Sequence, residues 1–414
     1  MKEILELAND CLNCKVKPCS IKGCPINTNI PEFINKVKEE NYEEAFEILQ
    51  ENNLSSYICS LVCPQEEQCE GSCIKGIQNN PVHIGNLEKA VNEWAIKNNY
   101  EYKIKQKEIN GKKAAIIGSG PAGLACSIEL LKEGFSVDIY EKDKLPGGIL
   151  LYGIPDFRLS KEIVEEFINK IKKLGANFFQ EKELGKDIFL EELSERYDAV
   201  FLGVGATQST TYKLSEETLQ GVYKSDEFLK AYNENNFIEN LGKVVVIGGG
   251  NVAMDSARAA KKMGAEEVKI LYRRDRKHMP AREIELEEAI KDGVKFNELV
   301  RVISADSEKG LIKNVNCIET EIVDGKAVDK SNVEYYKEEA NTVIFAIGLK
   351  PDKNLLQNQG IELDDWGYVK IDEYGKTNLK NVYAGGDNTE SKSTVCRALA
   401  AGKRAANGII KNIK

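Results

Sequence analysis

The segment 243–274 constrains the fold of this chain more than any other stretch. It reads KVVVIGGGNVAMDSARAAKKMGAEEVKILYRR, which predicts a short apolar strand, a glycine turn at Gly248 to Gly250, an amphipathic helix, and a second strand ending in Arg273 and Arg274. Elements in this order form a dinucleotide-binding unit. Glycines let the backbone approach a pyrophosphate, and the helix N-terminus offers free N–H groups to it.

The two arginines indicate which nucleotide this unit binds. An NAD site usually has Asp or Glu at this position to bind the ribose 2′-hydroxyl, whereas Arg273 and Arg274 suit a 2′-phosphate. Each charge-assisted hydrogen bond to that phosphate contributes on the order of 1.5 to 3 kcal/mol. We therefore predict an NADPH site. The alternative is a Rossmann-type helix that binds another nucleotide or none.

A second unit of the same kind lies nearer the N-terminus. The segment AAIIGSGPAGLACSIELLKEGFSVDIYEK contains a complete G-x-G-x-x-G at Gly118, Gly120 and Gly123. Its second strand ends at Glu141, whose carboxylate can bond a ribose that lacks a 2′-phosphate, so this unit suits FAD or NAD. Pro121 beside the turn is typical of the flavoprotein form of this motif, which favours FAD.

The cysteines are concentrated near the N-terminus, where eight of the eleven lie between Cys11 and Cys73. They form two groups on turns between short predicted helices, Cys11-x2-Cys14-x4-Cys19-x4-Cys24-Pro25 and Cys59-x3-Cys63-Pro64-x4-Cys69-x3-Cys73. A Cys-x2-Cys that closes on a Cys-Pro is typical of [4Fe–4S] ligation, and we predict two such clusters. Zinc is one alternative, but it prefers paired Cys-x2-Cys knuckles and the two histidines are not at ligand spacing. A disulfide or free-thiol module is the other.

Composition and charge exclude several classes of partner. Hydrophobic residues make up 42% of the chain and charged residues 30%, as in ordinary soluble proteins. The net charge is −9 without a basic block, so we expect no nucleic acid and no acidic membrane surface as partner. The N-terminal MKEILELAND carries no apolar run and no stretch of 18 apolar residues follows, so we expect a cytoplasmic protein.

These patterns predict an α/β chain with two Rossmann-like dinucleotide-binding domains, preceded by an α-helical two-cluster iron–sulfur domain. The closing segment NVYAGGDNTESKSTVCRALAAGKRAANGI predicts a strand, a Gly-Gly-Asp turn and a helix that return to the FAD domain, so the NADPH domain is inserted in it. The region 298–337 alternates loosely, as antiparallel strands do. The expected domains are 1–105 (iron–sulfur), 110–236 with 349–414 (FAD), and 237–348 (NADPH).

Two nucleotide sites in one chain predict hydride transfer from NADPH to a flavin. The protein supplies position and electrostatics for this reaction, and no catalytic side chain is required. Cys126, Cys317 and Cys396 are isolated in the sequence, and Cys126 is best interpreted as a small buried residue. A redox disulfide beside the flavin is therefore not expected, and the iron–sulfur clusters provide the other outlet for electrons.

With these residues in view, nearly all of the 414 residues resemble the glutamate synthase small (beta) subunit family. The wider family includes the N-terminal half of dihydropyrimidine dehydrogenase and the large subunit of the electron-bifurcating ferredoxin:NADP oxidoreductase. The most specific shared motifs are CSLVCPQEEQCEGSC, HIGNLE, GSGPAGL, GGILLYGIPDFRLSK, GGGNVAMD, YRRDRKHMPAR and YAGGD.

The resemblance implies a set of cofactor-binding residues. The ligands of one cluster would be Cys11, Cys14, Cys19 and Cys73, and those of the other Cys24, Cys63 and Cys69, with either Glu88 or Cys59 as the fourth. The FAD residues would be Gly118, Gly120, Gly123, Glu141, Gly148, Arg158, Asp387 and Thr394. The NADPH residues would be Gly250, Asn251, Val252, Arg273, Arg274 and Lys277.

The resemblance also implies a role for the whole chain. It predicts an electron-input subunit that oxidises NADPH and passes electrons through FAD and the clusters to a glutamate synthase large-subunit-like chain or another redox flavoprotein. One alternative is the large subunit of a bifurcating transhydrogenase, and a second is a free-standing NADPH-dependent reductase. A third is an accessory protein whose cofactors serve assembly or sensing.

Overall fold

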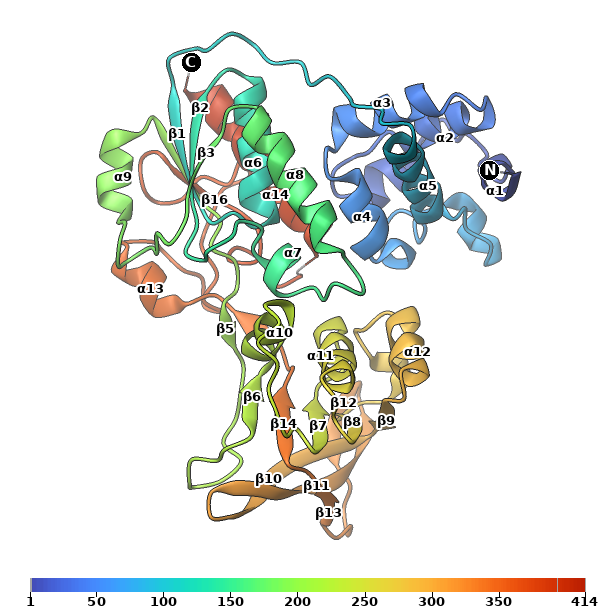
Figure 1. Cartoon of the computed structure of the whole chain (residues 1–414), viewed down its shortest axis with the longest axis vertical. Coiled ribbons are helices and arrows are strands. Elements are labelled where there is room, and N and C mark those ends of the chain that lie inside the picture. The colour runs from blue at the N-terminus through green and yellow to red at the C-terminus, as the bar shows by residue number, and fades with distance from the viewer. Residues whose placement is uncertain (1, 393, 414) are drawn as a thin grey trace. The chain divides into compact units, whose positions relative to one another are not determined.

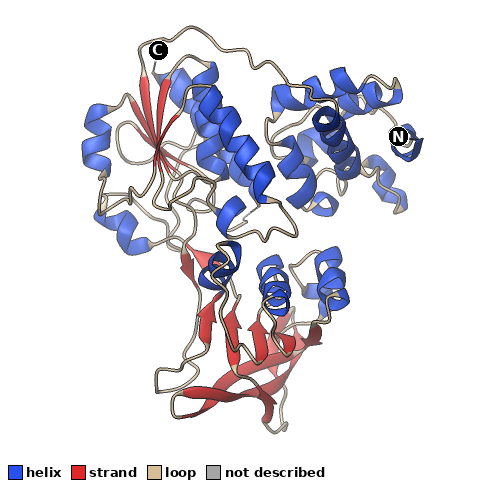
Figure 2. Ribbon diagram, viewed as in Figure 1, coloured by secondary structure: helices blue, strands red, loops and turns tan. Residues whose placement is uncertain are grey.

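The computed structural model describes residues 2–392 and 394–413, which Figures 1 and 2 show as ribbons. The chain divides into two compact units. The first comprises Met1–Leu151, Phe157–Ala206 and Pro351–Lys414, and the second Tyr152–Asp156 and Thr207–Lys350. Within the described ranges, no helix is both long enough and apolar enough to cross a membrane.

The N-terminal part of the first unit is helical, as the sequence predicts. Its α-helices are α1 (Lys2–Asn9), α2 (Ile30–Lys38), α3 (Tyr42–Asn52), α4 (Ser56–Val62) and α5 (Ile84–Lys97). Short turns η1 (Cys19–Gly23), η2 (Gln65–Glu67) and η3 (Ile74–Gln78) lie between them. The apolar faces of these helices meet in a core of their own around Phe33, Leu49 and Leu87, which are fully buried. Cys59 lies within α4, and the other seven cysteines of this part lie at the ends of these elements or in the turns between them.

A five-stranded parallel sheet with the order β16-β4-β1-β2-β3 forms the rest of the first unit. Its strands are β1 (Lys113–Ile117), β2 (Ser136–Tyr140), β3 (Asn177–Phe179), β4 (Ala199–Leu202) and β16 (Val382–Ala384). The helices of this part are α6 (Pro121–Lys132), α7 (Ile149–Tyr152), α8 (Lys161–Lys173), α9 (Leu190–Arg196), α13 (Lys353–Asn358) and α14 (Val395–Asn412). Figure 1 shows α6, α8 and α14 on one face of the sheet and α9 on the other. Strand β16 pairs with β4, which confirms the predicted return of the C-terminal segment.

The second unit contains a second five-stranded parallel sheet, with the order β6-β14-β7-β8-β9. Its strands are β6 (Val222–Lys224), β7 (Lys243–Ile247), β8 (Glu267–Tyr272), β9 (Lys295–Glu298) and β14 (Thr342–Phe345). The helices α10 (Ser225–Asn233), α11 (Asn251–Lys262) and α12 (Glu283–Lys291) lie on one face, with the short turn η4 (Arg276–His278) before α12.

An antiparallel sheet packs on the other face of this parallel sheet. Its strands are β10 (Val300–Glu308), β11 (Leu311–Val323), β12 (Lys326–Asp329) and β13 (Tyr336–Glu339), in the region where the sequence pattern predicts antiparallel strands. A two-stranded ribbon of β5 (Gln208–Ser209) and β15 (Leu349–Lys350) completes the unit. Val302 and Val315 of the antiparallel sheet share a core with Val245 and Leu271 of the parallel one.

The second unit begins earlier than the boundary at 237 that the sequence suggests. Strand β6 pairs with β14, with Val222 opposite Val343, so residues 207–236 belong with the second sheet rather than the first. The physical reason is that β6 is only three residues long and acquires its partner from a strand more than a hundred residues further along, a contact that carries no local sequence signal.

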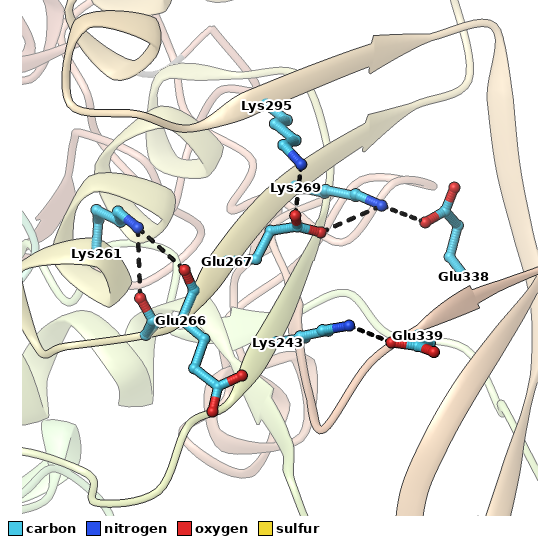
Figure 3. A network of polar contacts seen from close by, with 9 residues as sticks. Lys243, Lys261, Glu266, Glu267, Lys269, Lys295, Glu338 and Glu339 are labelled. Carbon is cyan, nitrogen blue, oxygen red and sulfur yellow. Dashed lines mark hydrogen bonds and ion pairs between the residues drawn. The ribbon is translucent and has the colours of Figure 1, made fainter.

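Ion pairs join the two sheets of the second unit. Glu267 of β8 binds Lys269 (3.3 Å) and Lys295 of β9, and Lys269 also binds Glu338 of β13. Figure 3 shows this network together with the Lys243–Glu339 pair and with Lys261, which donates to the backbone carbonyls of Ala265 and Glu266. In the strand register Glu267 lies opposite Lys243 of β7, whereas Lys269 lies opposite Lys295, so Lys295 reaches Glu267 diagonally.

Candidate cofactor sites

The glycine turn between β1 and α6 is shaped by close backbone contacts. Gly118 has φ +94°, and a Cβ atom there would lie 2.4 Å from the carbonyl oxygen of Gly203. A Cβ at Gly123 would lie 2.0 Å from the carbonyl oxygen of Gly118, so α6 packs directly on the end of β1. Gly120 differs, because a Cβ there would meet no atom within 4 Å. The N-terminus of α6 therefore faces open space, as a phosphate-binding turn requires.

Glu141 follows β2 directly and organises the same turn. It is 4% exposed, and one carboxylate oxygen accepts hydrogen bonds from the backbone N–H (3.0 Å) and the hydroxyl of Ser119. The other oxygen accepts from the N–H of Asp143 (2.9 Å). The hydroxyl oxygen of Ser119 accepts from Gly147 N–H (3.0 Å), and a Cβ at Gly148 would lie 2.8 Å from the Cα atom of Gly120. Five of the predicted FAD residues therefore lie around one turn: Gly118, Gly120, Gly123, Glu141 and Gly148.

The C-terminal segment supplies two more of the predicted residues. Asp387 follows β16, and the neighbouring Asn388 side chain donates to the carbonyl of Leu202 at the end of β4 (3.0 Å). Since β1, β2, β4 and β16 are parallel, Asp387 lies at the same sheet edge as the glycine turn. Thr394 caps α14, where its hydroxyl accepts from the N–H of Arg397 (3.3 Å). Arg158 lies half-buried between α7 and α8.

The turn between β7 and α11 repeats this arrangement in the second unit. A Cβ at Gly248 (φ +149°) would lie 2.2 Å from the carbonyl oxygen of Ala346, and one at Gly249 would lie 2.4 Å from the ring of Tyr272. Gly250 is open, with its nearest neighbour 4.0 Å away. Asn251 and Val252 begin α11, and the Asn251 side chain accepts from the N–H of Arg282 (2.9 Å).

Arg273 and Arg274 follow β8 directly, and hydrogen bonds to their backbone carbonyls fix their positions. Their carbonyl oxygens accept from the hydroxyl of Thr320 (2.8 Å) and the N–H of Leu299 (3.1 Å). Among the residues that the structure describes, no carboxylate pairs with either guanidinium, whereas the neighbouring Arg276 binds Glu283. The two guanidinium groups are thus available for an anion.

The third predicted cation of this site, Lys277, lies in the exposed turn η4. No acidic residue within the described ranges forms an ion pair with its ammonium group.

Four of the predicted cluster ligands line one pocket: Cys11, Cys14, Cys19 and Cys73. Burial, together with the neighbouring Cys11 and Cys73, raises the pKa of Cys14, and burial raises the pKa of Cys19 to about 11. The raised pKa favours the neutral thiol at each position, and a cationic centre between the sulfur atoms would favour the thiolate instead. The donor set fits a [4Fe–4S] cluster.

A second pocket contains the remaining predicted ligands. Its lining includes Cys24, Cys59, Cys63, Cys69, Glu88 and Cys396. Glu88 is 9% exposed, and burial followed by the nearby Cys59 and Cys24 raises the pKa of its carboxyl group. Cys59 accepts a hydrogen bond from the Asn53 amide (3.3 Å). This donor set also fits a [4Fe–4S] cluster, with more donors than the four it requires.

Cys396 is a residue of this pocket that the sequence pattern does not reveal. Its sulfur atom and those of Cys59 and Cys63 lie within 4.8 Å of one another, and all three residues are buried. Cys396 is isolated in the sequence but not in space, because α14 carries it into the pocket. Cys126 is fully buried in α6, as expected, and all eleven cysteines are unbridged.

Two known protein families match this chain, one over its N-terminal module and the other over its nucleotide-binding part. Residues 112–405 match the pyridine nucleotide-disulphide oxidoreductase family, and residues 1–100 match the family of dihydropyrimidine dehydrogenase domain II with its 4Fe-4S cluster. Among solved structures, FprA of Mycobacterium tuberculosis in complex with NADPH is similar in fold, with a TM-score of 0.63 and 23% identity. That similarity covers 73% of this chain and 84% of FprA.

Relatives identified by sequence are more similar. The glutamate synthase [NADPH] small chain of Escherichia coli (strain K12) is 34% identical over 97% of this chain and 90% of its own length. The NADPH-Fe(3+) oxidoreductase subunit beta of Geobacter sulfurreducens is 33% identical over 95% of this chain and 63% of its own length. The chain therefore belongs to the glutamate synthase small-chain family of NADPH-dependent FAD and iron–sulfur oxidoreductases.

Proposed function

We propose that this chain is the electron-input subunit of a larger redox assembly. Bound FAD would accept a hydride from NADPH, and two [4Fe–4S] clusters would carry its two electrons singly to a partner chain. One structural relationship carries the proposal: α14 begins at the proposed flavin site and also lines the second cysteine pocket. Its Thr394 hydroxyl accepts a hydrogen bond from Gln68 of the N-terminal module (3.3 Å), so both sites share one helix end.

The proposed FAD site follows from the open turn of the first unit. Gly120 and the N-terminus of α6 would accept the pyrophosphate, and Glu141 would bind the ribose hydroxyls. Asp387 would bond the ribityl chain, and α14 would direct its N-terminal dipole at the flavin ring and favour negative charge on it. Gly118, Gly123, Gly148, Arg158 and Thr394 complete the proposed site.

The proposed NADPH site uses the second turn in the same way. Gly250, Asn251 and Val252 would place backbone N–H groups against the pyrophosphate. The guanidinium groups of Arg273 and Arg274 would bind the 2′-phosphate, with Lys277 adding a third positive charge.

We assign the first pocket to a cluster held by Cys11, Cys14, Cys19 and Cys73, and the second to a cluster held by Cys24, Cys63, Cys69 and Glu88. Glu88 is preferred to Cys59 as the fourth ligand for a structural reason. Glu88 lines the second pocket, and among the described residues no cation or hydrogen-bond donor pairs with its buried carboxylate. A buried carboxylate without a partner is costly, and a metal ligand bond removes that cost.

The partner would dock over the first pocket. Two exposed apolar side chains line it, Leu12 and Ile74, and three more follow its cysteines in the sequence, Val16, Ile21 and Ile77. These five are here called the first-cluster face and are 61%, 38%, 69%, 66% and 85% exposed in the order named. Lys15 and Lys22 lie exposed among them, in a chain whose net charge is −9. An apolar patch with a basic rim suits a partner that presents an apolar patch with acidic residues around it.

Anaerobic affinity capture of the full chain from its own cells tests the proposal. Stoichiometric co-purification of a large amidotransferase-like flavoprotein would support the glutamate synthase assembly. Co-purification of a small ferredoxin–NAD-reductase-like chain would instead indicate electron bifurcation. If no partner co-purifies and the protein reduces a dye rapidly with NADPH, a free-standing reductase is favoured. Slow dye reduction by protein loaded with FAD and iron would instead indicate an accessory role.

A further inference from the structure

The second pocket holds more donors than one cluster can use. Five thiols and the Glu88 carboxylate line it, and a [4Fe–4S] cluster takes four protein ligands. Whichever residue completes the set, at least one thiol stays outside it. A thiol that remains beside a cluster is either an idle packing group or a group that acts on the cluster.

Cys396 is the thiol that reaches this pocket from outside the N-terminal module, because it lies on α14. Its sulfur lies within 4.8 Å of those of Cys59 and Cys63, and Cys24 lines the same pocket and packs against the same buried cluster. The side chain is 3% exposed, so water does not compete for its proton. It therefore lies beside two of the proposed ligands, Cys24 and Cys63.

The surrounding structure holds Cys396 in this position. Gly402 of α14 packs so closely on α6 that a Cβ there would lie 2.0 Å from the carbonyl oxygen of Ala122. The ammonium group of Lys403 donates to the carbonyl of Asn52 in the N-terminal module (2.6 Å). Together with the Gln68–Thr394 hydrogen bond, these contacts fix the start of α14 against the pocket.

We propose that Cys396 is not a cluster ligand, and that its S–H group donates a hydrogen bond to the sulfur of a ligand cysteine, Cys24 or Cys63. This inference rests on the proposed second cluster. A further thiolate buried beside the ligand thiolates would add an uncompensated negative charge, so the thiol keeps its proton. A hydrogen bond to a ligand sulfur stabilises the more negative, reduced state of a cluster, and therefore raises its reduction potential.

The consequence concerns the step that follows flavin reduction. Cys396 lies two residues after Thr394. The first turn of α14 would therefore face the flavin through Thr394 and set the reduction potential of the second cluster through Cys396. A higher potential at the second cluster makes it the favoured first acceptor of the flavin's electrons.

Substitution of Cys396 in the full-length holoprotein separates the possible roles. The variants are C396V, which fills the site with an apolar side chain and has no donor, and C396S, which keeps a donor. C317V is the matched control, because Cys317 is equally buried but belongs to the core of the second unit. Each protein is purified anaerobically, its iron, sulfide and FAD are quantified, and the potential of each cluster is measured by EPR-monitored redox titration.

We expect C396V to retain the wild-type iron content and to show a more negative potential for the second cluster only. C396S should restore most of that shift, and C317V should match the wild type. Loss of about half the iron in C396V would show that Cys396 is a ligand, and an unchanged potential would show that it only fills space; either result overturns the proposal. If C396V does not fold, C396A gives the same comparison. Absence of the second cluster from the wild type would contradict the proposed function instead.

Discussion

A Cβ atom at Gly123 would lie 2.0 Å from the carbonyl oxygen of Gly118, whereas a Cβ at Gly120, in the same turn, would meet nothing within 4 Å. Gly120 also has an ordinary φ of −72°, so alanine fits its backbone without strain. Two glycines three residues apart therefore serve different purposes. Gly123 permits the helix to pack on the strand, and Gly120 leaves room for a ligand.

The first prediction uses this difference. G120A should fold normally but bind FAD at least tenfold more weakly, because the methyl group occupies space that the pyrophosphate would need. G123A should lower the stability of the protein itself, since helix and strand must move apart. Titration of FAD into apoprotein and thermal unfolding without FAD measure the two effects. Unchanged FAD affinity in G120A would show that the phosphate lies elsewhere.

The second prediction concerns nucleotide choice. Replacing Arg273 and Arg274 together with glutamine should raise the KM for NADPH by about tenfold or more per lost charge-assisted bond, with little change in the KM for NADH. R301Q is the control, because Arg301 lies in the same unit and is bound to Asp329. Steady-state reduction of a dye with each nucleotide gives both constants. An equal rise for NADPH and NADH would refute the 2′-phosphate assignment.

The third prediction tests the two ligand sets. C14A should remove about half of the bound iron and leave FAD in place, because only the first pocket loses a ligand. C69A should remove the other half, and C126A, which changes a buried cysteine of α6 outside both pockets, should remove none. Iron and flavin are quantified per chain after anaerobic purification. Wild-type iron in C14A would mean that the first set is wrongly assigned.

The fourth prediction concerns the first-cluster face. Replacing Val16 and Ile77 with glutamate should leave NADPH-dependent dye reduction unchanged and slow electron transfer to the captured partner by about tenfold or more. Trp366 provides the control, since it is 73% exposed, lies in the first unit and is not part of this face. Stopped-flow oxidation of the reduced subunit by its partner measures the rate. Equal rates in the double variant and in W366E would show that the partner docks elsewhere.

The fifth prediction concerns the ion pairs between the sheets of the second unit. K269M removes the partner of Glu338 and Glu267 and should lower the local opening free energy of β8 and β13 by up to about 1 kcal/mol, less in concentrated salt. Hydrogen exchange of the amides in these strands measures this local opening free energy.

The pH dependence follows from Glu267. The hydrogen bond from Lys295 is the largest cause that lowers the pKa of Glu267, and the contact with Lys269 is a smaller one. Its contribution is therefore present above the unfolded carboxyl value of about 4.3 and is lost as pH falls through the folded pKa.

K295M provides the comparison for that measurement, because Lys295 pairs with Glu267 but leaves the Lys269–Glu338 pair intact. It should weaken the contact between β8 and β9 and leave β13 unchanged. Equal exchange in β13 for K269M and the wild type would show that the pair contributes nothing to holding the sheets together.

The sequence by itself determined the two dinucleotide-binding units and the contrast between them. Glu141 and Arg273 each follow the second strand of a unit whose strand, turn and helix are contiguous. Their positions therefore depend on backbone preferences within about thirty residues, which periodicity and glycine spacing express directly. The cysteine pockets are only partly local, because the first joins Cys73 to Cys11, Cys14 and Cys19, and the second joins Cys24 to Cys63 and Cys69.

Only the tertiary structure decided which distant segments meet. The inclusion of β6 in the second sheet and the arrival of Cys396 in the second pocket both depend on packing between residues far apart in the chain. Cys396 reaches Cys63 because Gly402 lets α14 lie against α6, and no spacing pattern encodes that approach. Local patterns report the conformation of a segment, but the contacts of its side chains depend on how whole helices and sheets bury their apolar faces together.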